Sequence, residues 1–141
     1  MSFLLDTCVL SELVRPAPNR GVVSWLDSKR PCYVSCLTLG ELKKGIDRLA
    51  IGKKRRRLDL WFEQRVLVEF VARTLDVDRE VSLVWGALSA RLSQSGVNLP
   101  AIDGLLAATA VHHRLSLVTR NTKDFVATGV DLINPWSDEL G

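Results

Sequence analysis

Four carboxylic acids stand where the sequence passes from an apolar stretch to the start of a helical pattern. They are Asp6, Glu41, Asp103 and Asp124. Each has an ordinary structural explanation, because a carboxylate at a helix start can cap backbone N–H groups or favour the helix dipole. Asp6 could cap a helix through Val9, and Thr38-Leu39-Gly40-Glu41 has the pattern of a capping box.

A parallel sheet would bring the four acids together. Its strands lead to helix N-termini along one edge, the carboxyl edge, where ligands bind. Carboxylates that share this edge repel one another unless they are protonated or neutralised by a cation. Oxygen ligands without Cys or His favour Mg²⁺ or Mn²⁺ over zinc. The sequence therefore predicts a divalent-metal site made of these four side chains.

Such a site is suited to phosphodiester hydrolysis. A bound cation orients the scissile phosphate, lowers the pKa of the attacking water and offsets charge on the leaving oxygen. A run of five cations also begins a predicted helix, where positive charge opposes the dipole. The run is Lys53, Lys54, Arg55, Arg56 and Arg57. We interpret it as a contact for the phosphates of a polyanionic substrate, and a solvated helix start is the alternative.

Other chemistry has little support in the sequence. The cysteines, Cys8, Cys32 and Cys36, lack the spacing of a closed zinc site. His112 and His113 are adjacent, so they point to different sides of a helix. The motifs of nucleotide-binding loops and of the serine nucleophile elbow do not occur. The four tryptophans stand mostly at apolar helical positions, which is typical of core residues.

The chain of 141 residues suits a single domain, which we place at 1–141. Hydrophobic residues make up 47% and charged residues 25%, as in folded proteins. The net charge of +3 is too small to indicate a nucleic-acid binder by itself. No apolar run approaches the roughly 20 residues that span a bilayer. Because nothing marks the chain for export, we expect it in the cytoplasm.

Short apolar or β-branched segments alternate with helical patterns. We expect strands at 2–5, 32–35, 115–119 and 130–133, with 75–77 as a strand or a connector. Asn19 and Asp78 are expected helix caps, Gly52 is the expected end of the third helix, and 101–113 is an apolar central helix. This order predicts an α/β fold with a mainly parallel sheet and helices on both faces.

Several segments together resemble a known family, the PIN domain. They are LLDTCVLSEL, LTLGELKKGI, LPAIDGLLAATAVHHRLSLVTRNTKDF and INPW, which follow one another in family order over nearly the whole chain. The chain is most similar to the toxin ribonucleases of type II toxin–antitoxin pairs, the VapC or FitB-like group.

The resemblance implies a three-layer α/β/α domain that cleaves RNA with Mg²⁺ or Mn²⁺. The acids of the family match Asp6, Glu41, Asp103 and Asp124, and its supporting polar residues match Thr7, Thr119 and Asn121. The resemblance also implies a homodimer and a cognate antitoxin that blocks the acidic pocket. One position departs from the family, because Cys8 stands where the family often has Asn.

Two other functions remain open at this point. The chain could be a non-catalytic nucleic-acid-binding or regulatory subunit that uses the basic helix 53–57. It could also be a metal-dependent phosphatase acting on small phosphoesters.

Overall fold

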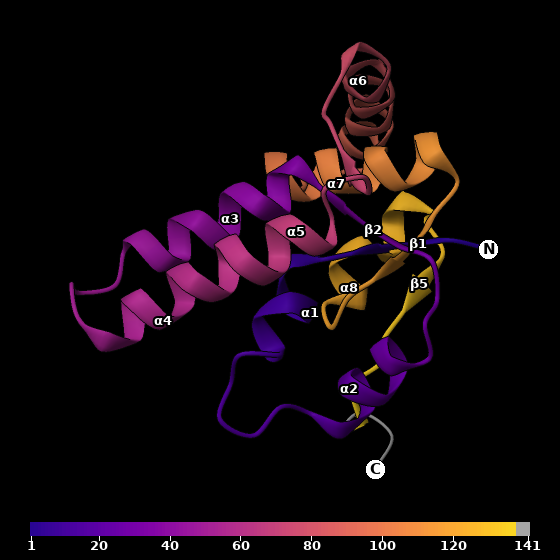
Figure 1. Cartoon of the computed structure of the whole chain (residues 1–141). Coiled ribbons are helices and arrows are strands. Elements are labelled where there is room, and N and C mark those ends of the chain that lie inside the picture. The colour runs from indigo at the N-terminus through magenta and orange to yellow at the C-terminus, as the bar shows by residue number, and fades with distance from the viewer. Residues whose placement is uncertain (138–141) are drawn as a thin grey trace.

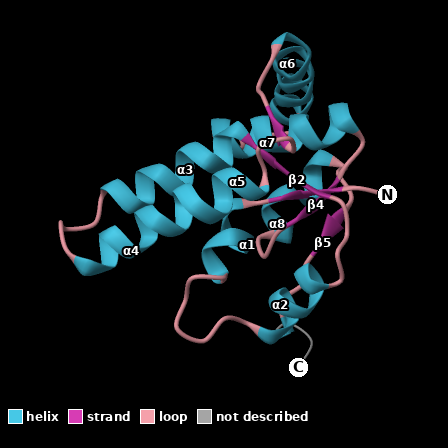
Figure 2. Ribbon diagram, viewed as in Figure 1, coloured by secondary structure: helices cyan, strands magenta, loops and turns pink. Residues whose placement is uncertain are grey.

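The computed structural model describes residues 1–137 and contains one parallel sheet of five strands within that range. The order across the sheet is β3-β2-β1-β4-β5, and every neighbouring pair is parallel. Figure 2 shows the strands at the centre of the molecule with helices around them. The strands are β1 (Phe3–Leu5), β2 (Cys32–Ser35), β3 (Thr74–Leu75), β4 (Ser116–Val118) and β5 (Leu132–Ile133).

Helices connect the strands and cover the sheet (Figure 1). Helix α3 and the continuous segment from α4 to α5 lie side by side, while α6 packs against α7. No described helix is long and apolar enough to cross a membrane. The helical segments are α1 (Thr7–Glu12), α2 (Arg20–Asp27), α3 (Cys36–Asp47), α4 (Lys53–Trp61), η1 (Phe62–Val66), α5 (Leu67–Glu69), α6 (Arg79–Gln94), α7 (Ala101–His113), α8 (Thr122–Phe125) and η2 (Val126–Thr128).

Strand β1 shows how the sheet separates two hydrophobic cores. Phe3 and Leu5 belong to the core on one face, which includes apolar residues of α1, α2 and α3. Leu4 belongs to the other core, with apolar residues of α6 and α7. Alternate residues of a strand point to opposite faces, so the uninterrupted apolar stretch Phe3–Leu5 fills both cores. The expected parallel sheet between two helical layers is confirmed.

Two predicted helix caps are present, and one predicted capping box is wrong. The Asn19 side chain accepts hydrogen bonds at the start of α2, and Asp78 does the same for α6. Helix α3, however, begins at Cys36 with Ser35 as its cap. Thr38 therefore lies inside the helix, fully buried, and its hydroxyl has no hydrogen-bond partner in the described structure. The same helix ends at Asp47, before the expected end at Gly52.

The helical segment that begins with the basic run at Lys53 contains a π-helical part, η1. Its apolar residues, Leu58, Phe62, Val66 and Phe70, are each four positions apart. In a regular α-helix a strict four-residue spacing drifts by about 40° per step, because one turn takes about 3.6 residues. The wider π turn reduces this drift, and Phe62, Val66 and Phe70 all remain buried in the same core.

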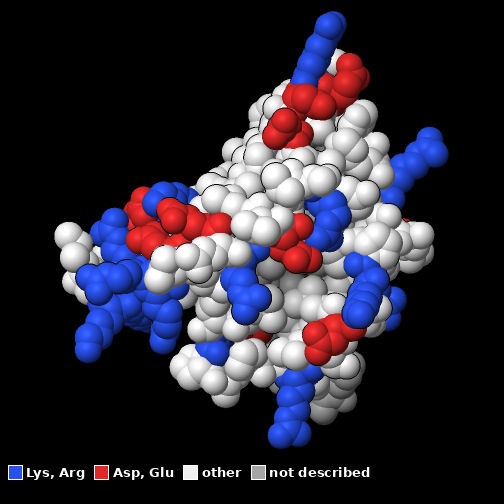
Figure 3. Space-filling view, viewed as in Figure 1, with Lys and Arg blue, Asp and Glu red and all other residues white. Residues whose placement is uncertain are grey.

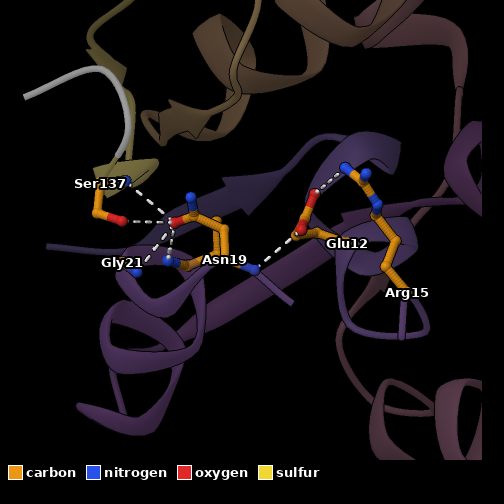
Figure 4. A network of polar contacts seen from close by, with 6 residues as sticks. Glu12, Arg15, Asn19, Gly21 and Ser137 are labelled. Carbon is orange, nitrogen blue, oxygen red and sulfur yellow. Dashed lines mark hydrogen bonds and ion pairs between the residues drawn. The ribbon is translucent and has the colours of Figure 1, made fainter. Parts of the chain in front are cut away.

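A polar network ties α1, α2 and the end of the described chain together (Figure 4). Glu12 is only 5% exposed and accepts a hydrogen bond of 2.9 Å from the backbone N–H of Asn19. Arg15 lies 3.3 Å from the same carboxylate. The Asn19 side-chain oxygen accepts from the N–H groups of Gly21 and Ser137 at 2.9 and 3.0 Å. The network fixes the position of α2 against the segment that follows β5.

Candidate functional site

The carboxyl edge of the sheet places Asp6 beside Thr119. Asp6 follows β1 and Thr119 follows β4, and these two strands are neighbours. The Asp6 N–H donates to the carbonyl of Val118 at 2.9 Å, so the sheet pairing extends to the acid itself. Because strand pairing fixes the backbone of Asp6, its carboxylate has a defined direction at the sheet edge.

Both carboxylate oxygens of Asp6 are held by hydrogen bonds. One accepts from the Thr7 backbone N–H at 2.7 Å, which makes Asp6 the cap of α1. The other accepts from the hydroxyl of Thr119 at 2.8 Å. Thr119 is fully buried, and its oxygen also accepts from the Asn121 N–H at 3.0 Å. The orientation of Asp6 is thus set by a buried hydroxyl whose own orientation is fixed by the backbone.

Glu41 is linked to the same helix start by Thr7. The Thr7 hydroxyl donates to a carboxylate oxygen of Glu41 at 2.5 Å, a contact between residues 34 positions apart in the sequence. Glu41 lies in the second turn of α3, and α3 packs against α1. Thr7 therefore links the two acids, because its backbone N–H donates to Asp6 and its hydroxyl donates to Glu41.

Asp103 lies in the first turn of α7, and its pKa reports on the other acids. Burial raises the pKa of Asp103 above its ordinary value of 3.8, and the negative charges of Asp6, Glu41 and Asp124 raise it further. The four acids predicted from the sequence therefore share one electrostatic neighbourhood. Close packing fixes this end of α7, since a Cβ added to the neighbouring Gly104 would lie 2.9 Å from the indole nitrogen of Trp85.

Asp124 and Asn121 come from the short helix α8 and are both exposed. Asn121 occupies the cap position of α8, but its side chain makes no capping hydrogen bond. The backbone N–H of Asp124 instead donates to the Asn121 carbonyl at 3.0 Å. Asp124 thus approaches the site from the solvent side, while Asp6 approaches it from the sheet.

Cys8 occupies the position where an amide was expected from the family resemblance. Its sulfur lies 3.7 Å from the Thr119 hydroxyl and 3.8 Å from a carboxylate oxygen of Asp6. Burial and the charge of Asp6 both raise the pKa of the Cys8 thiol. The neutral thiol is a weak hydrogen-bonding group, so Thr119 is the main side-chain support of Asp6.

The site fits a hard divalent cation in the chemistry of its donors. Carboxylate and hydroxyl oxygens are the ligands that Mg²⁺ and Mn²⁺ prefer. Mutual repulsion among the acids favours any cation that neutralises them. Within residues 1–137, however, no three acidic, His or Cys side chains are close enough to form a ready-made ligand set. The carboxylates would have to draw together around an ion.

The side chains of the basic run point to different sides of α4, the helix that they begin. Arg55 turns toward α3, where it lies 3.7 Å from Asp47 and donates to the Leu49 carbonyl. Lys54 and Arg57 instead line a groove of about 620 Å³ that begins beside Thr7 and Glu41. Arg15 and Trp61, which the sequence did not single out for binding, line the same groove. Helical spacing could have found Trp61, which stands four residues after Arg57 and seven after Lys54.

Comparisons with known proteins agree with this fold. The PIN domain family matches residues 3–130. Toxin FitB of Neisseria gonorrhoeae is 41% identical over 137 residues, or 96% of this chain and 99% of that protein. VapC ribonuclease Y4jK of Sinorhizobium fredii is 38% identical over 135 residues, or 94% and 96% of the two chains. The crystal structure of FitAcB from Neisseria gonorrhoeae superposes with a TM-score of 0.91 at 40% identity, covering 97% and 99% of the two chains. The chain therefore belongs to the PIN domain family.

Proposed function

We propose that this chain is a divalent-metal-dependent endoribonuclease and the toxin of a toxin–antitoxin pair. The observation that carries the proposal is the gathering of the acids at the carboxyl edge of the sheet, where Thr119 holds Asp6 and Thr7 holds Glu41. The raised pKa of Asp103, to which burial and the charges of the other three acids contribute, supports it. The names of two similar proteins support it, since one is called a toxin and the other a VapC ribonuclease.

In this proposal the acids of the site bind the cation. Asp6, Glu41 and Asp103 are its main ligands, and Asp124 binds a second ion or acts through water. Thr119 holds Asp6 in one orientation through its 2.8 Å hydrogen bond, and Thr7 does the same for Glu41. Asn121 contributes the backbone N–H that orients the Thr119 hydroxyl.

Mg²⁺ or Mn²⁺, when bound, would offset charge on the phosphate and favour ionisation of the attacking water. The chain itself positions the scissile phosphate at the carboxyl edge. We assign phosphate contacts to the basic run Lys53, Lys54, Arg55, Arg56 and Arg57, and Figure 3 shows Lys and Arg side chains gathered over the start of α4. Two of the five, Lys54 and Arg57, line the groove that begins beside Thr7 and Glu41. Phosphate contacts of this kind fix the register of an RNA strand without reading its bases.

We propose further that the whole chain, 1–141, acts as one PIN domain in the cytoplasm, where its RNA substrate is found. A homodimer and a cognate antitoxin that covers the acidic site complete the proposal. Both partners follow from the resemblance to type II toxins.

The test is cleavage of total cellular RNA by the purified chain, free of any partner, in Mg²⁺, Mn²⁺ or EDTA. We expect discrete RNA fragments that form only in the presence of metal. The rate of cleavage should fall by at least about a thousandfold in Asp103→Asn, because that variant loses both a negative charge and a metal ligand. The variant must remain folded by circular dichroism. Intact RNA in the presence of metal and folded wild-type protein would contradict the proposal, and the binding-subunit function would then replace it.

A further inference from the structure

Thr38 carries a buried hydroxyl that the fold does not use. Its side chain is fully buried inside α3, and within residues 1–137 the hydroxyl has no hydrogen-bond partner. By contrast, Thr109 is also fully buried inside a helix, and its hydroxyl donates to the Leu105 carbonyl at 2.8 Å. An unpartnered polar group in the interior destabilises a fold, whereas valine has the same shape without that cost. Packing alone therefore does not account for the hydroxyl of Thr38.

The position of Thr38 links this hydroxyl to the acidic site. Strand β2, which leads into α3, is paired with β1, which leads to Asp6. Thr38, Leu42 and Ile46 form the buried stripe of α3. Glu41 borders that stripe and reaches α1 through its hydrogen bond with the Thr7 hydroxyl. Because side chains three residues apart on a helix are neighbours, with about 5–6 Å between their Cβ atoms, the hydroxyl of Thr38 lies beside an acid of the site.

Asp6 and Glu41 are supported unequally by the metal-free fold. Both carboxylate oxygens of Asp6 accept hydrogen bonds, one from the Thr7 N–H and one from the Thr119 hydroxyl. Among the described residues, only one oxygen of Glu41 accepts a hydrogen bond, and the donor is the Thr7 hydroxyl. The acids of this part of the chain do not form a ready-made ligand set, so they must draw together to hold a cation. Glu41, held at one oxygen and carried on the longer side chain, can move more easily than Asp6.

We propose that Thr38 is a positioning residue of the cation site, and that its hydroxyl donates to the free oxygen of Glu41 when the acids draw together. Thr7 and Thr38 then hold Glu41 as Thr7 and Thr119 hold Asp6. A hydrogen bond that forms only in the cation-bound state adds to the affinity for the cation. The inference rests on the proposed metal-dependent function and adds to it a residue that orients one of the acids.

Thermal unfolding in EDTA tests the metal-free half of the proposal. Thr38→Val keeps the shape of the side chain and removes the hydroxyl. We expect its Tm to rise by about 2 °C or more, because an unpartnered polar group leaves the interior. Thr109→Val is the matched control, since it makes the same change inside a helix where the hydroxyl has a partner, and its Tm should fall. Circular dichroism measures both.

Titration of Tm with Mg²⁺ or Mn²⁺ tests the cation-bound half. Each protein is compared with its own Tm in EDTA, so differences in the stability of the metal-free folds cancel. The concentration of metal that gives a fixed rise in Tm should be about tenfold higher for Thr38→Val than for wild type. It should be unchanged for Thr109→Val. Thr38→Ser keeps the hydroxyl, so its metal requirement should stay within about twofold of wild type.

The positioning role and the proposed function fail in different ways. A metal requirement of Thr38→Val equal to that of wild type would overturn the positioning role, and RNA cleavage by the wild type would still establish the ribonuclease. A fall in Tm in EDTA like that of Thr109→Val would also overturn it, because the hydroxyl would then have a partner in the metal-free fold.

The opposite failure is equally visible, since the titrations contain no RNA. A wild-type protein that is stabilised by metal through Thr38 but never cleaves RNA would lose the ribonuclease function alone. No rise in the wild-type Tm with either metal would overturn both proposals.

Discussion

Asp103 and Glu12 are both acids that are at least partly withdrawn from water, yet their pKa values move in opposite directions. For Glu12, burial favours a higher pKa, but hydrogen bonding from Asn19 and the charge of Arg15 outweigh it and the net shift is downward. For Asp103, burial raises the pKa, and the charges of three other acids add to the rise. One carboxylate is supplied with donors by the fold, and the other is surrounded by carboxylates.

The comparison distinguishes an acid that the fold itself neutralises from the acids that we propose to bind a cation. Glu12 is satisfied within the network of Figure 4, so its charge contributes to stability without any ligand. The acids near Asp103 repel one another, and the fold leaves that repulsion unrelieved. This arrangement supports the proposed cation site, because perturbed pKa values gather at functional sites.

Removal of the Thr119 hydroxyl should lower the activity of the acidic site, although less than the loss of Asp103 itself. Thr119→Val retains the shape but deletes the donor to Asp6, so we expect cleavage to fall about 10–100-fold and half-maximal activity to need more metal. Thr119→Ser should restore much of the activity. The measurement is the rate of RNA cleavage against Mg²⁺ or Mn²⁺ concentration.

Thr128→Val is the matched control for this change. Thr128 is also buried, donates to the Phe125 carbonyl and accepts from the Val130 N–H, but it does not contact the acids. We expect it to lower stability and leave the metal dependence unchanged. Similar metal curves for the two valine variants would mean that Thr119 only supports the fold.

The sequence was most informative where local patterns determine structure. Helix α7 and strand β2 have the predicted bounds, because apolar continuity and flanking residues mark both. The start of α3 was mispredicted because both Ser35 and Thr38 can cap a helix, and α3 begins directly after β2 with Ser35 as its cap. The sequence offered two caps of similar quality and no local signal that chose between them.

The site was predictable in part for the same reason. The acids could be placed on one edge because a parallel sheet brings strand ends together. The hydrogen bond from Thr7 to Glu41 joins residues 34 positions apart, so it depends on how α1 packs against α3. The groove lined by Trp61, Lys54 and Arg57 depends on the packing of three helical segments, and the sequence pattern alone marked Trp61 as a core residue.

Neutralising Glu12, the structural acid of the comparison, should destabilise the fold. Glu12→Gln keeps an oxygen for the Asn19 N–H but loses the charge that faces Arg15, so we expect unfolding to become easier by about 1–2 kcal/mol at neutral pH. Because the pKa of Glu12 is lowered, its negative charge stabilises the folded state at pH values above the ordinary pKa of 4.5. This stabilisation is lost as the pH falls through the pKa of Glu12 in the folded state. The difference between variant and wild type should therefore shrink in acid.

Denaturant unfolding at several pH values measures this effect, and RNA cleavage by the folded variant should be unchanged. A difference that stayed constant from pH 7 to acid would show that the charge of Glu12 contributes nothing.

Neutralising Asp103 should stabilise the metal-free fold, whereas neutralising Glu12 destabilises it, and we expect this effect to be the smallest of the three. Its raised pKa means that the folded state holds its proton more tightly than the unfolded state, so ionisation at neutral pH destabilises the fold. In EDTA, Asp103→Asn should therefore raise Tm by about 2–4 °C at pH 7. The gain should disappear below about pH 3.8, the ordinary value, where the wild-type acid is protonated in both states.

With added Mg²⁺ or Mn²⁺, the wild-type protein should then have a higher Tm than Asp103→Asn. An ion that binds only the folded state raises its Tm by mass action, and the wild type retains the ligand that the variant lacks. Wild type should gain more from metal than Asp103→Asn, while Glu12→Gln should gain as much as wild type. A variant less stable than wild type in EDTA at pH 7 would mean that Asp103 is a structural acid like Glu12, and the contrast between the two regions would be lost.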